Sequence, residues 1–128
     1  MRAMFDLNVL LDVLQLRQPW VRASGELCAR AVRGELEGVV APHALTTLFY
    51  VLDRHADRAT AEKDVDWLLR SFALAPAECS VFLRARALQL PDFEDAVVAA
   101  AAEAARRKAA ASPVRGRPSL KLTRYLKV

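Results

Sequence analysis

The chain has 128 residues, a formal net charge of +4 and a hydrophobic share of 54%, which suits one domain with a single buried core. Charges such as Asp12 and Arg17 interrupt every apolar run before the roughly 18 residues that a membrane span needs, so we expect no transmembrane segment. Met1 and Arg2 are followed within six residues by Asp6, unlike a secretion signal, and we expect a cytoplasmic protein.

The cysteines and histidines do not form a metal-binding pattern. Cys28 and Cys79 are far apart and lack the C-x-x-C spacing, so we interpret both as reduced thiols of the core. His43 and His55 have no second His or Cys at ligand spacing, which argues against a zinc site.

The charge is unevenly distributed along the chain. From Ala104 onward there are eight Lys or Arg and no acid, whereas the first 103 residues hold 11 bases and all 15 acids. We treat residues 1–128 as a single domain in which about 111–128 form an atypical basic tail. The tail either attracts the phosphates of a nucleic acid or is a solvated terminus without a partner.

A strand and two helices are predicted at the beginning of the chain. Arg2–Phe5 is a short apolar run that stops at an acid and predicts a strand. Asn8–Arg17 predicts a helix whose polar stripe includes Asp12, which we expect to face solvent. Pro19 opens a second helix through about Arg33.

Strands and helices alternate through the middle of the chain. Gly38–Ala41 predicts a buried strand, and a helix follows from His43 to Asp53. Another helix is predicted over Asp57–Ser71, before a third short strand at Phe72–Ala75.

The last predicted helices run from Ala77 to about Leu88 and, rich in alanine, from Phe93 to Ala110. Ser112–Pro118 is predicted to be a loop, and within the tail only Leu120–Leu122 could supply another strand. Alternating strands and helices predict an α/β fold with a parallel sheet covered on both faces.

Three acids stand where ligands bind in such a fold. Asp6 follows the first strand, and Asp92 and Asp95 lie three residues apart at the head of the alanine-rich helix. Close approach of three carboxylates is costly unless a hard cation such as Mg²⁺ or Mn²⁺ neutralises them.

Each acid also has a purely structural explanation. Asp92 can cap the alanine-rich helix, with Asp95 near the positive end of the helix dipole. Asp6 or Asn8 can cap the first helix in the same way. The sequence alone leaves both explanations open.

Three segments resemble blocks of the PIN-domain family. Met4–Leu14 is similar to its opening strand that ends in D-x-N, and Ala41–Leu52 is similar to its second strand exit and helix. Leu90–Val97 resembles the third block, in which an Asp heads a helix rich in alanine. The three blocks occur in the family's order.

The resemblance implies an α/β/α sandwich with a central, mainly parallel sheet and a ribonuclease site that uses Mg²⁺ or Mn²⁺. By position, Asp6 and Asp95 would be the main metal ligands and Asp92 an auxiliary one. Asn8 would orient Asp6 or the substrate phosphate.

Two departures from the family pattern concern ligands. The family usually has Glu or Asn where this chain has Thr47, and its late T-R-N or T-R-D motif is replaced by Glu103–Ala111. Losing a ligating carboxylate weakens metal binding. We assign substrate contacts to Thr46, Thr47, Arg106 and Arg107.

Two functions follow from this resemblance. The first is a magnesium-dependent endoribonuclease, the toxin of a toxin–antitoxin pair, which cleaves single-stranded or structured RNA with metal-activated water. The alternative is a PIN-like module that no longer cuts and binds a protein or RNA. Expected partners are RNA, an antitoxin protein and a second copy of the chain. The aromatic candidates for an antitoxin groove are Trp20, Phe49, Tyr50 and Trp67.

Overall fold

A computed structural model describes residues 1–107. Its centre is a parallel sheet of three strands in the order β1, β2, β3: β1 (Arg2–Phe5), β2 (Glu37–Val40) and β3 (Ala73–Leu74). Arg2 is in register with Glu37, and Phe5 is in register with Val40. The predicted α/β class and parallel pairing are therefore confirmed.

Six helices complete residues 1–107, and each lies near its predicted position. They are α1 (Leu7–Leu14), α2 (Val21–Val32), α3 (Pro42–His55), α4 (Arg58–Ser71), α5 (Cys79–Leu88) and α6 (Phe93–Arg107). The first helix is shorter than predicted, because the backbone of Leu16 turns to a left-handed conformation with φ of 52°. The predicted end of α6 at Ala110, the loop at Ser112–Pro118 and the strand at Leu120–Leu122 lie outside the described residues.

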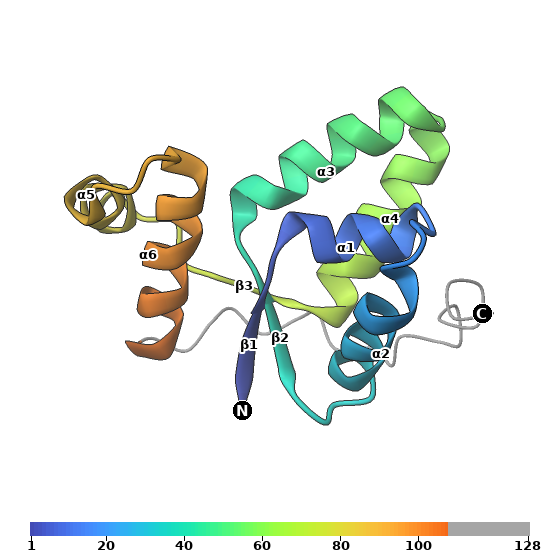
Figure 1. Cartoon of the computed structure of the whole chain (residues 1–128), viewed down its shortest axis with the longest axis horizontal. Helices are drawn as coiled ribbons and strands as arrows, with labels where there is room; N and C mark the ends of the chain where they lie inside the picture. The colour runs from blue at the N-terminus through green and yellow to red at the C-terminus, as the bar shows by residue number, and fades with distance from the viewer. Residues whose placement is uncertain (108–128) are drawn as a thin grey trace.

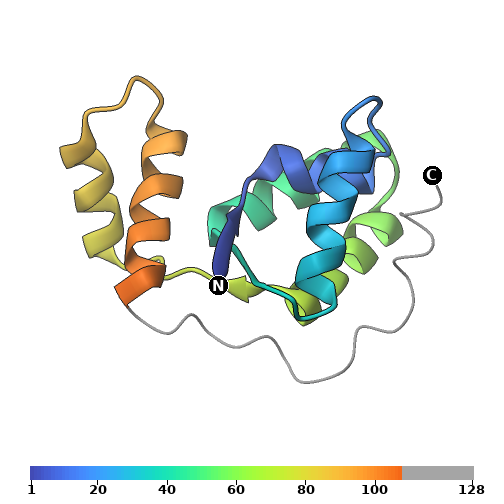
Figure 2. The same cartoon turned by 60° about the horizontal axis from the view of Figure 1, so that its bottom comes forward.

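The sheet separates two hydrophobic cores. Neighbouring residues of a strand point to opposite faces, and here Phe5 and Val40 face the core formed with α1 to α4. Met4 and Val39 face the second core, which α5 and α6 cover. Figures 1 and 2 show the α5–α6 hairpin on one side of the sheet and the other helices on the opposite side.

In the larger core, three aromatic rings pack against one another beside Gly38. The Phe72 ring packs edge-on against Phe5 at 5.0 Å and against Trp67 at 5.9 Å between ring centroids. A Cβ atom at Gly38 would lie 2.5 Å from Cδ1 of Phe72. Gly38 therefore lets the central strand approach Phe72.

The contact between α1 and α2 corrects one prediction. The sequence pattern predicts that Asp12 faces solvent, but it is half-buried and accepts a 3.0 Å hydrogen bond from the Ser24 hydroxyl on α2. Close packing of α1 on α2 turns the polar stripe of α1 toward its neighbour. Burial, and to a lesser extent the Asp12 carboxylate, raise the pKa of the Cys28 thiol to about 12.

One of the two cysteines predicted for the core lies on the surface, and the aromatic groove candidates differ in exposure. Cys28 is buried as expected, but Cys79 is exposed at the first position of α5. Trp67 is buried, whereas Trp20 and Tyr50 are 62% and 60% exposed. Within residues 1–107, no helix is long and apolar enough to cross a membrane.

Candidate active site at the carboxyl ends of the strands

Asp6 directly follows β1 and serves as the N-cap of α1. Its Oδ2 accepts a 3.0 Å hydrogen bond from the backbone N–H of Asn8, and both residues are exposed. The backbone of Asp6 is extended, with φ of −72° and ψ of 152°. The Asp6 side chain thus lies at the carboxyl end of β1, against the first turn of α1.

Helix α6 runs along β1 in the opposite direction (Figure 1). At one end, the Arg2 guanidinium donates a 2.6 Å hydrogen bond to the carbonyl oxygen of Ala105. Further along, Met4 and Ala102 line a common cavity of about 120 Å³. The first turn of α6 therefore reaches the carboxyl end of β1.

Ideal strand and helix rises allow the positions of Asp6 and Asp95 along β1 to be compared. From Arg2 to Asp6 the strand advances about 13 Å at the usual rise per residue. From Ala105 back to Asp95 the helix advances about 15 Å. If α6 lay strictly antiparallel to β1, the two acids would have similar positions along the strand direction.

Asp95 also lies on the side of α6 that follows β1. Residues spaced three and four apart share one side of a helix, and Asp95, Val98, Ala102 and Ala105 have this spacing. Ala102 and Ala105 both line the cavity beside β1. Asp95, which is exposed, therefore lies on the side of α6 that borders this cavity.

Asp92 has a different role at the head of the helix. Its Oδ1 accepts a 3.0 Å hydrogen bond from the backbone N–H of Asp95, as an N-capping side chain does. Among residues 1–107, no three Asp, Glu, His or Cys side chains gather as a group that could hold a metal ion. Within this part of the chain, the structure therefore does not show the three-carboxylate group expected from the sequence.

Helix α3 contributes His43 and Thr47 to the same end of the sheet. Val40, the partner of Phe5, is the last residue of β2, and α3 begins at Pro42 after the capping residue Ala41. One flank of α3 packs on α4, where the Arg58 guanidinium lies 5.2 Å above the Phe49 ring. By helical periodicity, His43 and Thr47 share the opposite flank.

Two threonine hydroxyls of α3 bond to the same backbone carbonyl oxygen, that of His43. The hydroxyls of Thr46 and Thr47 donate to the carbonyl oxygen of His43 at 2.8 Å and 3.3 Å. Thr46 is exposed and Thr47 is half-buried. Nε2 of His43 is buried and has no hydrogen-bond partner within the part of the chain that the structure describes. The spacing of ligand residues in the sequence assigned His43 no role. A signal that could have drawn attention to it is Pro42, which marks the start of a helix directly after a strand end.

Arg106 and Arg107 lie at the other end of α6. They are about 17 Å along the helix axis from Asp95, beside the beginning of β1. Arg107 lies 4.0 Å from Glu103, which also binds Arg84 at 3.0 Å. Any contact of Arg106 and Arg107 with RNA is therefore remote from Asp6 and Asp95.

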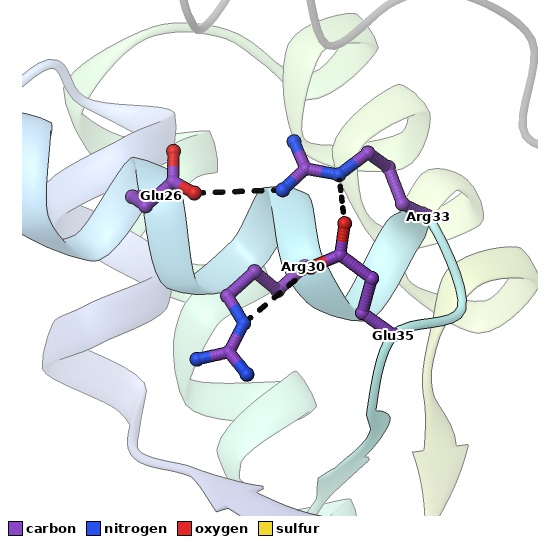
Figure 3. A network of polar contacts seen from close by, with 4 residues as sticks. All are labelled: Glu26, Arg30, Arg33 and Glu35. Carbon is purple, nitrogen blue, oxygen red and sulfur yellow. Dashed lines mark hydrogen bonds and ion pairs between the residues drawn. The ribbon is translucent and has the colours of Figure 1, made fainter.

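A second basic region near α2 is neutralised by acids. Figure 3 shows Arg33 bonded to Glu35 and Glu26, with Arg30 also paired to Glu35. The hydrogen bond with Arg33 lowers the pKa of the Glu35 carboxyl and raises the pKa of Arg33. Because their charges are paired, Arg30 and Arg33 are poor candidates for binding phosphate.

The family model of the PIN domain matches residues 2–110. The chain belongs to the PIN-domain family. This confirms the resemblance inferred from the three sequence blocks and assigns the chain a nuclease-type fold. Comparisons with curated proteins and with solved structures gave no match.

Proposed function

We propose that this PIN domain is a metal-dependent endoribonuclease with its site at Asp6 and Asp95. The observation that supports the proposal is that Asp6 directly follows β1 and that Asp95 lies in the first turn of α6, the helix whose last turn is bonded to the start of β1. Carboxylates at the carboxyl ends of parallel strands are well placed to bind a ligand.

The donor set fits a hard divalent cation. Mg²⁺ in nucleotide-processing sites is often bound by one or two carboxylates, with waters and substrate phosphates filling the remaining positions. Asp6 and Asp95 would hold Mg²⁺ or Mn²⁺ in this way. Such an ion lowers the pKa of its bound water and stabilises negative charge on the scissile phosphate.

The neighbouring residues have supporting roles in this proposal. The Asn8 side chain is exposed beside Asp6, where it can orient that carboxylate or the phosphate. Asp92, predicted as an auxiliary ligand, acts through Asp95 by bonding to its backbone N–H. Thr46 and Thr47 are the proposed hydroxyl contacts to substrate, and Arg106 and Arg107 attract RNA over a longer range.

We further propose that the protein is the toxin of a cytoplasmic toxin–antitoxin pair. An antitoxin that buries an apolar surface would find exposed aromatic side chains at Trp20 and Tyr50. A homodimer is the proposed assembly of the toxin. Co-purification with an antitoxin encoded beside it, together with the mass of the complex, tests both statements.

RNA cleavage tests the nuclease proposal. The full chain is incubated with single-stranded and structured RNA in Mg²⁺ and in EDTA, beside Asp6→Asn and Asp95→Asn. Each substitution removes a carboxylate while keeping its shape, so we expect both variants and EDTA to abolish cleavage. Asp66→Asn on the exposed surface of α4 is the matched control and should cut normally. Cleavage that persists in both site variants contradicts the proposal.

A second candidate is a PIN domain that binds RNA without cutting it. This alternative is favoured by the neutral Thr47 and by the lack, among residues 1–107, of a three-ligand group. It predicts RNA binding that is indifferent to Mg²⁺ and to Asp95→Asn. The same set of variants, assayed for RNA binding as well as cleavage, separates the two functions.

A further inference from the structure

We propose that the groove between α5 and α6 lined by Arg84, Arg106 and Arg107, the arginine groove, binds a backbone phosphate of RNA directly. The inference rests on RNA as the substrate of the proposed function, but it concerns a second site, about 17 Å along α6 from Asp95. Attraction over a long range needs only positive charge, whereas a bound phosphate needs hydrogen-bond donors that converge on it.

The arginine groove gathers side chains from both helices of the hairpin. A cavity of about 330 Å³ is lined by Arg84 of α5 and by Glu103, Arg106 and Arg107 of α6. Glu103 precedes the two arginines of α6 by three and four positions, so these three side chains share one side of the helix. Arg84 reaches the same place from α5, because its guanidinium donates to Glu103 at 3.0 Å and 3.4 Å. Three guanidinium groups therefore surround one carboxylate.

The positive charge of the arginine groove is only partly neutralised. Glu103 pairs closely with Arg84 but lies 4.0 Å from Arg107, whose side chain is 72% exposed. Within residues 1–107, the Arg106 side chain forms no ion pair or hydrogen bond. The hydrogen bond from Arg84 lowers the pKa of Glu103 most, and the charges of Arg107 and Arg106 lower it further. The lining thus carries an excess of two positive charges, which an anion can offset.

A phosphodiester suits the arginine groove. The planar guanidinium can donate two parallel hydrogen bonds to its oxygens. All three arginines are exposed, so the groove can admit one unit of a longer strand. The adjoining cavity of about 320 Å³ on the other side of Arg107 is lined by Glu78, whose carboxylate repels phosphate. The phosphate is therefore assigned to the side of Arg107 that faces Arg84 and Arg106.

Replacing Arg106 with Lys distinguishes a bound phosphate from attraction by charge, because Lys keeps the charge and loses the planar pair of donors. Binding of a labelled single-stranded 2′-O-methyl oligoribonucleotide to the full chain is followed by fluorescence anisotropy in EDTA, where metal-dependent cleavage cannot occur. We expect Arg106→Lys to raise the Kd about fivefold, as the loss of one net hydrogen bond does. Arg22→Lys, on α2 across the sheet from α6, is the matched control and should leave the Kd unchanged. Equal Kd values for Arg106→Lys and the native chain overturn the inference.

Two other anions test whether the ligand is RNA. A carboxylate of an acidic polypeptide fits the same guanidinium fork, so the measurement is repeated with labelled poly-L-glutamate, whose Kd should not depend on Arg106→Lys. A rise for poly-L-glutamate and none for the oligonucleotide would assign the groove to an acidic protein. Inorganic phosphate should weaken oligonucleotide binding no more than chloride at equal ionic strength. A larger effect of phosphate, lost in Arg106→Lys, would assign the groove to the free ion and overturn the assignment to RNA.

The result can be told apart from the outcome of the nuclease assay. A rise in Kd for Arg106→Lys in a protein that does not cleave RNA supports the arginine groove and overturns the nuclease proposal. Cleavage that requires Asp6 and Asp95, together with a Kd that Arg106→Lys does not change, supports the nuclease proposal and overturns the arginine groove. Lys keeps a positive charge at the carboxyl end of α6, so the variant should fold as the native chain does.

Discussion

The Arg2 guanidinium donates a hydrogen bond to the carbonyl oxygen of Ala105 across 103 positions of sequence, at 2.6 Å. This bond ties the last turn of α6 to the first residue of β1. Because helix and strand run in opposite directions, fixing one end also sets how far the head of α6 extends past the strand. Arg2 therefore helps to fix the position of α6 along β1.

Replacing Arg2 should therefore destabilise the domain. Arg2→Ala removes the charged donor to Ala105, and we expect a loss of about 1 kcal/mol in the free energy of unfolding, measured by urea denaturation. Arg2 also forms a 2.7 Å ion pair with Glu37, but that pair is partly exposed. Glu37→Gln should consequently cost less. If both variants lose the same free energy of unfolding, the loss comes from the ion pair between Arg2 and Glu37 and not from the hydrogen bond to Ala105.

Gly38→Ala should destabilise the larger core. The added Cβ would lie 2.5 Å from Cδ1 and 2.7 Å from Cε1 of Phe72, and the ring is held between other aromatic side chains. We expect a loss of about 1–3 kcal/mol in urea denaturation. Gly34→Ala is an imperfect control, since its φ of 79° is itself unfavourable for alanine. A better control is the pair Gly38→Ala with Phe72→Leu.

In that pair, the smaller leucine makes room for the added methyl group. The Gly38 substitution should cost less in the Phe72→Leu background than in the native chain. An equal cost in both backgrounds would show that contact with Phe72 is not the cause.

Burial of Cys28 predicts a pH dependence of stability. The folded protein raises the pKa of this thiol from 9.0 to about 12, so it stays protonated where the unfolded chain ionises. Stability should therefore fall as pH rises from about 9 toward 12, by about 1 kcal/mol at pH 10. Urea denaturation at pH 8 and pH 10 measures the change.

Substitution of each cysteine identifies the source of that change. Cys28→Ala should reduce the difference between pH 8 and pH 10, although its overall stability is lower because the side chain fills the core. Cys79→Ala removes an exposed thiol and should leave the pH dependence as it is. An unchanged difference in Cys28→Ala would rule out the buried thiol as its origin.

Local sequence patterns are sufficient to predict the strand end at Asp6 and the helix start at Asp92. The acid after the strand at Asp6 and the acids heading the alanine-rich helix are readable because strand ends and helix caps depend on neighbours in sequence. The order of strands and helices is set by the same short-range patterns. These features can therefore be predicted from residues that are close together in sequence.

The features that sequence did not predict depend on distant contacts. Asp12 faces Ser24 because of how α2 packs on α1, and the flank carrying His43 and Thr47 faces away from α4 because Phe49 packs under Arg58. The spacing of residues within one helix shows which residues share a side. It does not show which neighbouring helix packs against that side. The same holds for the expected three-carboxylate group, because tertiary placement decides whether Asp6, Asp92 and Asp95 meet, and no such group forms within residues 1–107.

Substitutions should show that Asp92 and Asp95 have different roles. Asn is as good an N-cap as Asp, so Asp92→Asn should keep both the stability and most RNA cleavage. Asp92→Ala removes the acceptor for the Asp95 backbone N–H and should cost about 1 kcal/mol in thermal or urea unfolding. If Asp92→Asn abolishes cleavage as completely as Asp95→Asn, then Asp92 is itself a metal ligand.

Arg106 and Arg107 should affect RNA affinity without affecting the chemical step. They lie about 17 Å along α6 from Asp95, so replacing both with Gln should raise KM and leave kcat near the native value. The slope of log Kd against log salt should decrease by about one for each RNA phosphate that the variant no longer neutralises. Arg30→Gln with Arg33→Gln is the matched control, because those charges are already paired with acids and their removal should change the slope little. A fall in kcat in the Arg106 and Arg107 variant, with an unchanged salt slope, would mean that these arginines act on the site through the position of α6 and not by attracting RNA.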